Sequence, residues 1–453
     1  MSRLLLTTII LTLIISNVFA QGEELSLDDC IQIALKNNYN IKISKYFKES
    51  AEEDVTSSYS GILPNASVSA SISRFEVGPV EDIGDFPVGI DSVTGLPKYE
   101  SRKYTQPGFG RNSNSLNLRI SQNIFDGGEW WNAISYAKSQ NQSSEFEMKS
   151  TVNSTVRDVQ SKYFELLKQQ KLLEVNEIAV QRSQDQLDKT QKMFELGAVA
   201  KVDVFRSKVN LGNDKIQLLT QKNAVITAKN NLNLALGREP DLLIKIKPEL
   251  QLRTTFDNVD TLILQALNNN PQIKKNKEEY NSSNIMTSRA YSVLYPSLGA
   301  FFNYSRSNEE LNKVYSDYDK NWNISFGVSL SLNLFNGFRD KVNIQKSKLS
   351  AKNALANYEI AKLSTRASVV QLVDNYNSYL EIIKINEENL EAAKEEYRLA
   401  EERYRIGSGT QLEVREAQVN LTRAEQTLVA AQYNARITQA QLEEALGTIY
   451  AKN

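Results

Sequence analysis

The stretch "YRIGSGTQLEV", residues 404–414, separates two long segments that contain no helix breaker. Residues 338–406 have neither glycine nor proline, and residues 410–446 have none either. Glycine readily adopts the left-handed backbone that ends a helix, so Gly407 and Gly409 predict a turn between two antiparallel helices. Thr410 and Glu413 have the spacing of a capping box, which would begin the second helix.

The same stretch occurs a second time, 210 residues earlier, as "FELGAVAKVDV" at 194–204. "IFDGG" and "LFNGF", at Phe125 and Phe335, share this offset, whereas "ALKNN" at 34–38 and "ALNNN" at 266–270 are 232 residues apart. Internal repetition indicates a duplicated architecture. The first copy therefore carries 22 extra residues (232 − 210), which we place in a long loop within 76–112, rich in Gly, Pro and Asp.

The predicted domain boundaries follow from this duplication. We expect a signal peptide at 1–20, a first structural repeat at 21–237, a linker at 238–258, a second repeat at 259–447 and a short tail at 448–453. Each repeat is expected to contain a helix, two strands joined by a loop, a very long helix, a turn and a last helix.

The long helices carry apolar seams. A helix over 129–196 or 338–406 would be about 100 Å long. Two seams on one helix predict two neighbours, as in a closed tube of helices around a lumen, and a compact bundle is the alternative. In the last helix the first seam comprises Val414, Ala417, Leu421, Ala424, Leu428, Ala431, Ala435, Thr438, Leu442 and Ala445, and the second Leu412, Val419, Ala430, Tyr433, Ile437 and Ala440.

Four segments alternate apolar and polar residues with the period of a β-strand: 66–72, 116–124, 298–304 and 322–334. A soluble, half-buried sheet is one explanation, but the lengths also fit membrane strands with an apolar outer face. Four strands have open edges and cannot span a bilayer alone, so three chains would close a twelve-stranded barrel. Aromatic residues at the strand ends are expected at the membrane interface: Phe125, Trp130, Trp131, Trp322, Phe335 and Phe338.

The N-terminus predicts export. Arg3, an apolar run and a small residue at Ala20 follow the order of a secretory signal peptide cleaved after Ala20. A membrane anchor is the alternative, although the run is shorter than the roughly 20 residues of a spanning helix. Cys30, the single cysteine, lies too far from that site for lipid attachment and is expected to be a buried thiol.

Composition excludes several classes of function. The chain has no histidine and one cysteine, which excludes a histidine-dependent triad, a Cys/His zinc site and an internal disulfide. A formal net charge of −1 gives no general argument for binding nucleic acid. A carboxylate-only enzyme remains formally open, but no pair of acids stands out, so we expect no enzyme and no cofactor.

The doubled order of these motifs resembles the TolC-like outer-membrane efflux factors, over nearly the whole chain that follows the signal peptide. "QNIFDGG" and "SLNLFNGF" at the strand-to-helix joints carry the resemblance, together with the two helix breaks. It implies a mostly α protein with β-strands: a homotrimer whose twelve-stranded transmembrane β-barrel, four strands per chain, continues into a long periplasmic α-helical barrel. It also implies an outer-membrane location and two partners, a periplasmic adaptor (membrane fusion) protein and an inner-membrane RND or ABC transporter.

The resemblance also implies site residues. The two turns would be adaptor-docking tips, formed by Leu196, Gly197, Ala198 and Val199 and by Ile406, Gly407, Ser408 and Gly409. Glu413 and Glu416 would form a cation-sensitive constriction, with Asp203 and Tyr404 in contacts that hold the entrance shut. Helix capping alone for Glu413 and a solvated surface for Glu416 are the alternatives. Gly409 replaces a basic residue of some relatives, so the closing network is expected to differ.

Three functions follow from this reading. The first is a passive exit duct for efflux or type I secretion, with energy supplied elsewhere. A trimeric outer-membrane adhesin is the alternative, although such proteins place their strands at the C-terminus, whereas here the strands occur twice in mid-chain. The carboxylate enzyme is the third.

Overall fold

The protein is described by a computed structural model that covers residues 24–253, 256 and 258–450. The predicted signal peptide and its cleavage site lie outside the described residues, as do parts of the linker and tail. The described chain forms two compact units. One comprises Glu53–Lys138 and Ser282–Ala351, and the other contains the remaining described residues.

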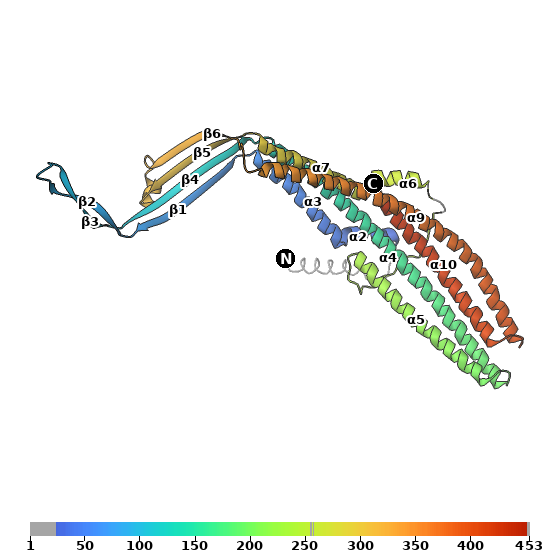
Figure 1. Ribbon diagram of the computed structural model, residues 1–453. Coiled ribbons are helices and arrows are strands. Elements are labelled where there is room, and N and C mark those ends of the chain that lie inside the picture. Colours follow the sequence, from blue (N-terminus) through green and yellow to red (C-terminus); the bar gives the residue numbers. More distant parts are fainter. Residues whose placement is uncertain (1–23, 254–255, 257, 451–453) are drawn as a thin grey trace, which may run out of the picture. The chain divides into compact units, whose positions relative to one another are not determined.

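The larger unit is helical. It contains two hairpins of long helices that turn at the same end (Figure 1). α4 (Glu129–Glu195) is followed by α5 (Lys201–Ala235), and α9 (Arg339–Arg405) by α10 (Gln411–Ala445). The shorter helices are α2 (Leu27–Asn37), α3 (Tyr39–Ser58), α6 (Val259–Asn269) and α7 (Pro271–Tyr291). The predicted long helices are confirmed to within a residue or two of their expected ends.

The hydrophobic core of this unit joins helices that are distant in sequence. Cys30 and Ala34 of α2 pack with Val159 and Tyr163 of α4 and Leu232 of α5. A second cluster joins α6, α9 and the end of α10. The predicted burial of the Cys30 thiol is confirmed, because the residue is 0% exposed.

The duplication reappears in atomic detail where short helices meet long ones. The Asn38 amide, between α2 and α3, donates to the carbonyl of Ala235 at 2.9 Å. Asn270, between α6 and α7, donates to the carbonyl of Ala445 at 3.0 Å. Both contacts fill a carbonyl that the end of a helix leaves without an internal partner.

The first predicted seam of α10 is confirmed, and the second in part. Of the first seam, Val414, Ala435 and Leu442 are fully buried, and Leu428 and Ala445 are half-buried. In the second seam Tyr433 and Ala440 are buried, but Leu412 is 67% exposed. The second seam therefore packs within this chain along only part of its length.

The smaller unit holds an antiparallel sheet of four strands in the order β1-β4-β5-β6 (Figure 1). The strands are β1 (Asn65–Val77), β4 (Phe109–Phe125), β5 (Ser297–Asn308) and β6 (Trp322–Ser331). The register aligns the alternating residues of neighbouring strands. Ile72 pairs with Asn114, Leu118 with Tyr304 and Phe302 with Phe326. Even-numbered positions therefore form one mainly apolar face, and odd-numbered positions form a face rich in serine and asparagine.

The long loop predicted within 76–112 is a β-hairpin instead. β2 (Val80–Ile90) and β3 (Pro97–Gln106) pair as a separate two-stranded sheet. The Gly, Pro and Asp residues that suggested a loop fall partly inside these strands, where Gly89 and a register shift after Pro87 accommodate them. In the second copy a short helix, α8 (Leu311–Ser316), occupies the corresponding connection.

Strand ends also differ from the sequence prediction. β6 ends at Ser331, three residues before the end of the alternating pattern. β4 begins at Phe109 and β1 continues to Val77, because these two strands pair along thirteen positions. Among the described residues, no helix is both long enough and apolar enough to cross a membrane.

Candidate functional site

The two helix turns at the tips have the same backbone geometry. Gly407 has φ +78° and Gly197 has φ +74°, both in the left-handed region. The amides of Gly407 and Ser408 donate to the carbonyls of Tyr404 and Arg403, at 3.1 and 2.9 Å. The first turn repeats this pattern at Gly197 and Ala198. These paired bonds form a Schellman motif, which ends each helix and reverses the chain.

Gly409 has a different role from Gly407. Its φ is not positive, but a Cβ there would lie 3.0 Å from both the Arg403 Cβ and Glu413 Oε2. Glycine at 409 therefore allows the turn to approach α9 closely. The two glycines of the motif solve two separate problems, one conformational and one steric.

Glu413 forms the predicted capping box. Its backbone amide donates to Thr410 Oγ1 at 3.2 Å, and its carboxylate accepts from the Thr410 amide at 3.2 Å. Arg403 lies 3.8 Å away from the same carboxylate. The Glu413 side chain stays 43% exposed, so capping does not bury its charge.

The other predicted gate residues occupy three different environments. Glu416 is exposed on the next turn of α10. Asp203 lies in the first turn of α5 and pairs with Arg206 at 3.5 Å. Tyr404 is only 3% exposed. Within the described residues no hydrogen bond joins Asp203 to Tyr404.

Tyr404 instead belongs to a buried polar cluster drawn from four helices. Its hydroxyl lies 3.5 Å from Thr190 Oγ1 of α4. The Ser207 hydroxyl of α5 donates to Thr190 at 3.3 Å, and Gln411 of α10 donates to Ser207 at 3.2 Å. All four side chains are at most 6% exposed. Satisfied buried hydrogen bonds of this kind fix one arrangement of the helices, because an unpaired buried group is costly.

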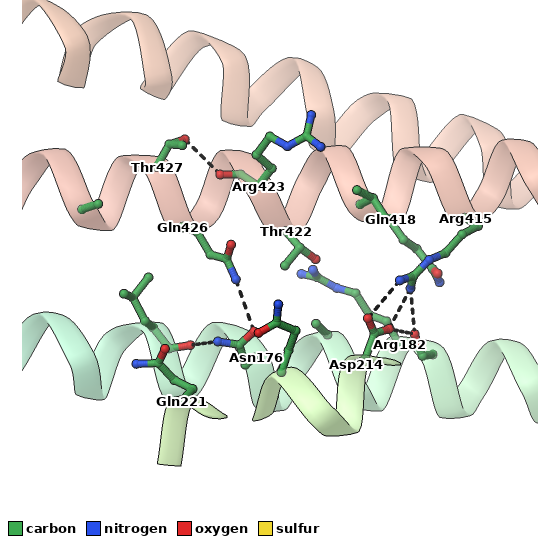
Figure 2. A pocket seen from close by; sticks show the side chains of 16 residues that line it. Asn176, Arg182, Asp214, Gln221, Arg415, Gln418, Thr422, Arg423, Gln426 and Thr427 are labelled. Carbon is green, nitrogen blue, oxygen red and sulfur yellow. Dashed lines mark hydrogen bonds and ion pairs between the residues drawn. The ribbon is translucent and has the colours of Figure 1, made fainter. Parts of the chain in front are cut away.

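A second polar site lies farther along the same helices. A cleft of about 590 Å³ lies between α10 and the α4–α5 hairpin. Figure 2 draws the side chains that line it. At one end Arg415 makes two hydrogen bonds to Asp214, at 2.7 and 2.9 Å, and donates to Ser183 at 3.3 Å. Arg182 makes a similar forked contact with Glu425, at 2.8 and 3.1 Å. We call these two forked pairs the inter-hairpin clamp, because each joins α10 to the other hairpin.

These polar contacts were not predicted from the sequence, although it carries a signal for them. Ser207, Asp214 and Gln221 recur every seven residues on α5. The second copy has alanine at each equivalent position, namely Ala417, Ala424 and Ala431. Each polar residue is hydrogen-bonded to α4: Ser207 donates to Thr190, Asp214 accepts from Ser183, and Gln221 donates to Gln169. Polar residues at a heptad position normally specify which helices pair.

The predicted interfacial aromatics lie at both ends of the four-stranded sheet. Phe125, Phe335 and Phe338 are at the end where the strands join helices, and all three are more than 40% exposed. Trp322 begins β6 at the other end and is 52% exposed. Trp131 is exposed, whereas Trp130 is half-buried against Gly61, where a Cβ would approach the Trp130 Cβ to 2.9 Å.

These features can be compared with known proteins. The sequence profile of the outer membrane efflux proteins matches the chain twice, over residues 30–238 and 262–448. The chain belongs to this family. The probable efflux pump outer membrane protein TtgC of Pseudomonas putida is 23% identical over 305 residues, which cover 67% of this chain and 63% of TtgC. This chain thus aligns with slightly less than two thirds of TtgC.

Other relatives of this outer membrane efflux protein align over more of their length. TolC of Vibrio cholerae is 23% identical over 411 residues, 89% of this chain and 86% of that protein. TolC of Escherichia coli is 22% identical over 358 residues, 76% and 71% of the two chains.

Solved structures show the same fold. The outer membrane protein VceC of Vibrio cholerae has a TM-score of 0.75 at 17% identity, covering 93% of this chain and 96% of VceC. CusC has a TM-score of 0.78 at 17% identity, covering 93% and 92%. The predicted fold class is confirmed, and this outer membrane efflux protein resides in the outer membrane with helices that extend into the periplasm.

Proposed function

We propose that three copies of this outer membrane efflux protein close one barrel and act as the passive exit duct of a tripartite efflux or type I secretion system. The observation that carries this proposal is the four-stranded sheet. It has one apolar and one polar face, and within the described chain its outer strands β1 and β6 are each paired on one side only, with β4 and β5. In a bilayer such open edges must be paired, because lipid offers no hydrogen bonds.

A periplasmic adaptor is the proposed partner at the helix tips. Leu196 is 84% exposed and Ile406 is 72% exposed, at equivalent positions of the two turns. Large apolar side chains on an exposed turn are typical of a contact site. The tips proposed to meet the adaptor are Leu196–Val199 and Ile406–Gly409, and the energy would come from an inner-membrane RND or ABC pump.

Glu413 and Glu416 are proposed to form the periplasmic constriction. Three chains would place six carboxylates near the axis, where a narrow lumen strengthens their potential. The exposure of both side chains supports this role, and the capping bonds of Glu413 are compatible with it. Tyr404 would act in the closed state through its buried contact with Thr190, and Asp203 through its ion pair with Arg206.

Planar-bilayer recording tests the duct and its constriction together. The purified protein is expected to form channels that divalent cations block from the periplasmic side. The double variant Glu413→Ala, Glu416→Ala should lose most of this block. The control is Glu387→Ala with Glu388→Ala, which removes the same charge from an exposed stretch of α9. If divalent cations block the Glu413→Ala, Glu416→Ala variant as strongly as the natural protein, these residues do not form the constriction. If the purified protein forms no channel at all, the proposed duct is wrong.

A chromosomal deletion would separate efflux from secretion. Efflux predicts that the mutant becomes more sensitive to toxic small molecules. Relatives of this chain in Pseudomonas putida include an antibiotic and a toluene efflux pump outer membrane protein. Secretion predicts instead the loss of a protein from the culture medium. Complementation with a chain altered at Leu196 and Ile406 would show whether the tips are required in either case.

The boundaries of the two repeats, 21–237 and 259–447, remain part of this proposal. The equivalent hydrogen bonds of Asn38 and Asn270 support them, since the two bonds occupy corresponding places in the two repeats.

A further inference from the structure

Residue pairs between strands of the first repeat recur in the second repeat at the two sequence offsets, 232 and 210 residues. Ser71 of β1 pairs with Ser115 of β4. Adding 232 and 210 to these numbers gives Asn303 and Ser325, and these two residues pair between β5 and β6. The side chains repeat the relation, with a hydroxyl contact of 2.9 Å in the first pair and an Asn303-to-Ser325 bond of 3.4 Å in the second. The two repeats therefore share one strand register.

The contact between the repeats predicts how the open edges of the sheet pair. β4 of the first repeat pairs antiparallel with β5 of the second, and Arg119 lies opposite Asn303. The equivalents of these residues are Ser329 on β6 and Ser71 on β1, which lie on the two open edges of the sheet. A ring closes only if these edges meet, and copies of one contact build a closed ring most simply.

We infer that β6 of one subunit pairs antiparallel with β1 of the next in a fixed register, with Ser329 opposite Ser71 of the next chain. This inference rests on the proposed trimeric barrel and adds the residues that form its subunit boundary. It places Val328 opposite Ile72 and Leu330 opposite Ala70, so the apolar face continues across the boundary. The polar face continues too, because Ser329 and Ser71 both belong to it.

The helices support the same partner, a second copy of this chain. Within the chain α10 of the second repeat packs on α4 of the first through polar groups, for example Arg415 on Ser183 and Gln426 on Asn176. The equivalents of Arg415 and Gln426 on α5 are Phe205 and Ile216, which are 56% and 63% exposed. An exposed apolar stripe at heptad spacing requires a covering helix.

That stripe runs the length of α5. It comprises Val202, Phe205, Val209, Ile216, Leu219 and Ile226, all at least 52% exposed. By the same relation its partner is α9 of the preceding subunit, the one whose β6 pairs with this chain's β1, and Ile382, Ile385 and Leu399 of α9 are also exposed. In the half of α10 nearer the tip the contact inside a subunit is therefore mainly polar, whereas nearer the base Tyr433 joins the apolar core. The equivalent contact between subunits is apolar.

The short helices show the same contrast. On α7, Lys275 pairs with Glu147 of α4 at 2.7 Å, and Ser139 of α4 donates to the Glu278 carbonyl at 3.1 Å. The equivalents of Lys275 and Glu278 on α3 are Ile43 and Tyr46, which are 50% and 64% exposed. Apolar burial drives association in water, so this chemistry suits a boundary that forms only when subunits meet.

Disulfide cross-linking tests the register. The background is Cys30→Ala, which removes the single native cysteine. In Ser71→Cys with Ser329→Cys, the two thiols within one chain lie on opposite edges of the sheet. Three strand spacings alone separate them by about 14 Å, which is already too far for a disulfide. Oxidation in outer-membrane vesicles is therefore expected to link different chains and give a covalent ladder up to the trimer on non-reducing gels.

Two matched controls shift the register by two residues on the same polar face. Ser69→Cys with Ser329→Cys and Ser73→Cys with Ser329→Cys separate the two Cα atoms by about 8 Å, beyond disulfide range. These pairs should give several-fold less covalent trimer than the predicted pair. Equal or greater cross-linking in a shifted pair would overturn the register. Absence of cross-links in all three, in material that light scattering shows to be trimeric, would overturn the edge pairing.

Failure of the underlying function would look different. If the unmodified protein, extracted in detergent, has the mass of a single subunit, the proposal of a trimeric duct is wrong. The inferred pairing of β6 with β1 between subunits is then wrong as well. A second variant tests the helical part. Ile216→Gln, which copies the residue at Gln426, should lower the temperature at which the trimer dissociates in SDS, whereas Gln426→Ile should not. An unchanged dissociation temperature for Ile216→Gln would show that α5 does not contribute to the contact between subunits.

Discussion

Cys30 illustrates how a single side chain depends on the completed core. Its thiol is fully buried among α2, α4 and α5, and desolvation raises its pKa from 9.0 to about 12. Nearby Asp29 acts in the same direction, because a negative charge disfavours the thiolate. As expected from the sequence, the residue is thus a small apolar group in the core.

The raised pKa makes the stability of the protein depend on alkaline pH. Below pH 9 the thiol is neutral in both the folded and the unfolded chain, so its full contribution to the free energy of unfolding is present. Above pH 9 the unfolded chain ionises and the folded chain does not, so stability falls by about 1.4 kcal/mol per pH unit up to the folded pKa. Cys30→Ala should therefore lose less stability than the natural protein between pH 9 and pH 11.

Urea unfolding in detergent, followed by tryptophan fluorescence at each pH, measures this difference. Parallel loss in the two proteins would show that Cys30 does not titrate as its burial implies. Labelling of the folded natural protein with a maleimide should also be slow up to pH 9, because the thiolate is the reactive form.

At the scale of the element, the two tip hairpins end their first helices identically but begin their second helices differently. Thr410 caps α10 with its side chain and forms a capping box with Glu413. The equivalent residue, Ala200, precedes α5 and makes no side-chain cap. This difference is predictable from the sequence, since an alanine side chain has no acceptor for the free amides of the first turn.

Exchanging the two caps tests their contribution. Thr410→Ala should destabilise the α9–α10 hairpin by about 1 kcal/mol, since the Glu413 amide loses its acceptor. Ala200→Thr should stabilise the α4–α5 hairpin by a similar or smaller amount, because Asp203 occupies the position of the capping-box acid. Hydrogen exchange of the tip amides reports both changes. Equal protection in Thr410→Ala and the natural protein would contradict the role of the cap.

How much the sequence predicts also depends on scale. The two longest helices are predictable because no glycine or proline interrupts residues 129–196 or 338–406. Alternation of apolar and polar residues with a period of two predicts the positions of all four strands of the main sheet. The hairpin β2–β3 was missed because Gly, Pro and Asp are tolerated in a short two-stranded ribbon, where each strand has only one neighbour.

The polar contacts of the candidate site were harder to predict. The sequence places Tyr404 near the end of a long predicted helix, and only the structure shows its hydroxyl beside Thr190. Pairing in three dimensions decides such contacts, since residues on four helices must meet. The missed signal, polar residues at 207, 214 and 221, becomes visible when the two copies are compared position by position.

At the scale of the molecule, the two repeats are alike in backbone and different in chemistry. Contacts between repeats inside one subunit use ion pairs and amides in addition to the apolar core that Tyr433 joins, and the equivalent surfaces left open are apolar. Each subunit can therefore hold its own two hairpins together through directional bonds before it meets another subunit. This division explains why a duplicated chain does not simply pair any repeat with any other.

The inter-hairpin clamp should therefore be a main stabiliser of the single subunit. The four charged side chains of Arg182–Glu425 and Arg415–Asp214 are only 16–21% exposed. Arg182→Gln with Arg415→Gln leaves two half-buried carboxylates without their partners, so we expect a loss of about 2–5 kcal/mol in the free energy of unfolding. Arg398→Gln is the matched control, because Arg398 also makes forked bonds, to Glu395 and Glu402, but its side chain is 53% exposed.

Exposed ion pairs contribute little, so Arg398→Gln should cost less than about 1 kcal/mol. Urea unfolding of the detergent-solubilised protein measures all three chains, and limited proteolysis locates the change, which should open cleavage in α10 first. If the clamp and control variants lose the same stability, the forked pairs do not hold α10 to α4 and α5, and the core at the base of the hairpins does so alone. A large loss confined to the clamp variant would mean that polar bonds order each subunit first and apolar surfaces then join the subunits.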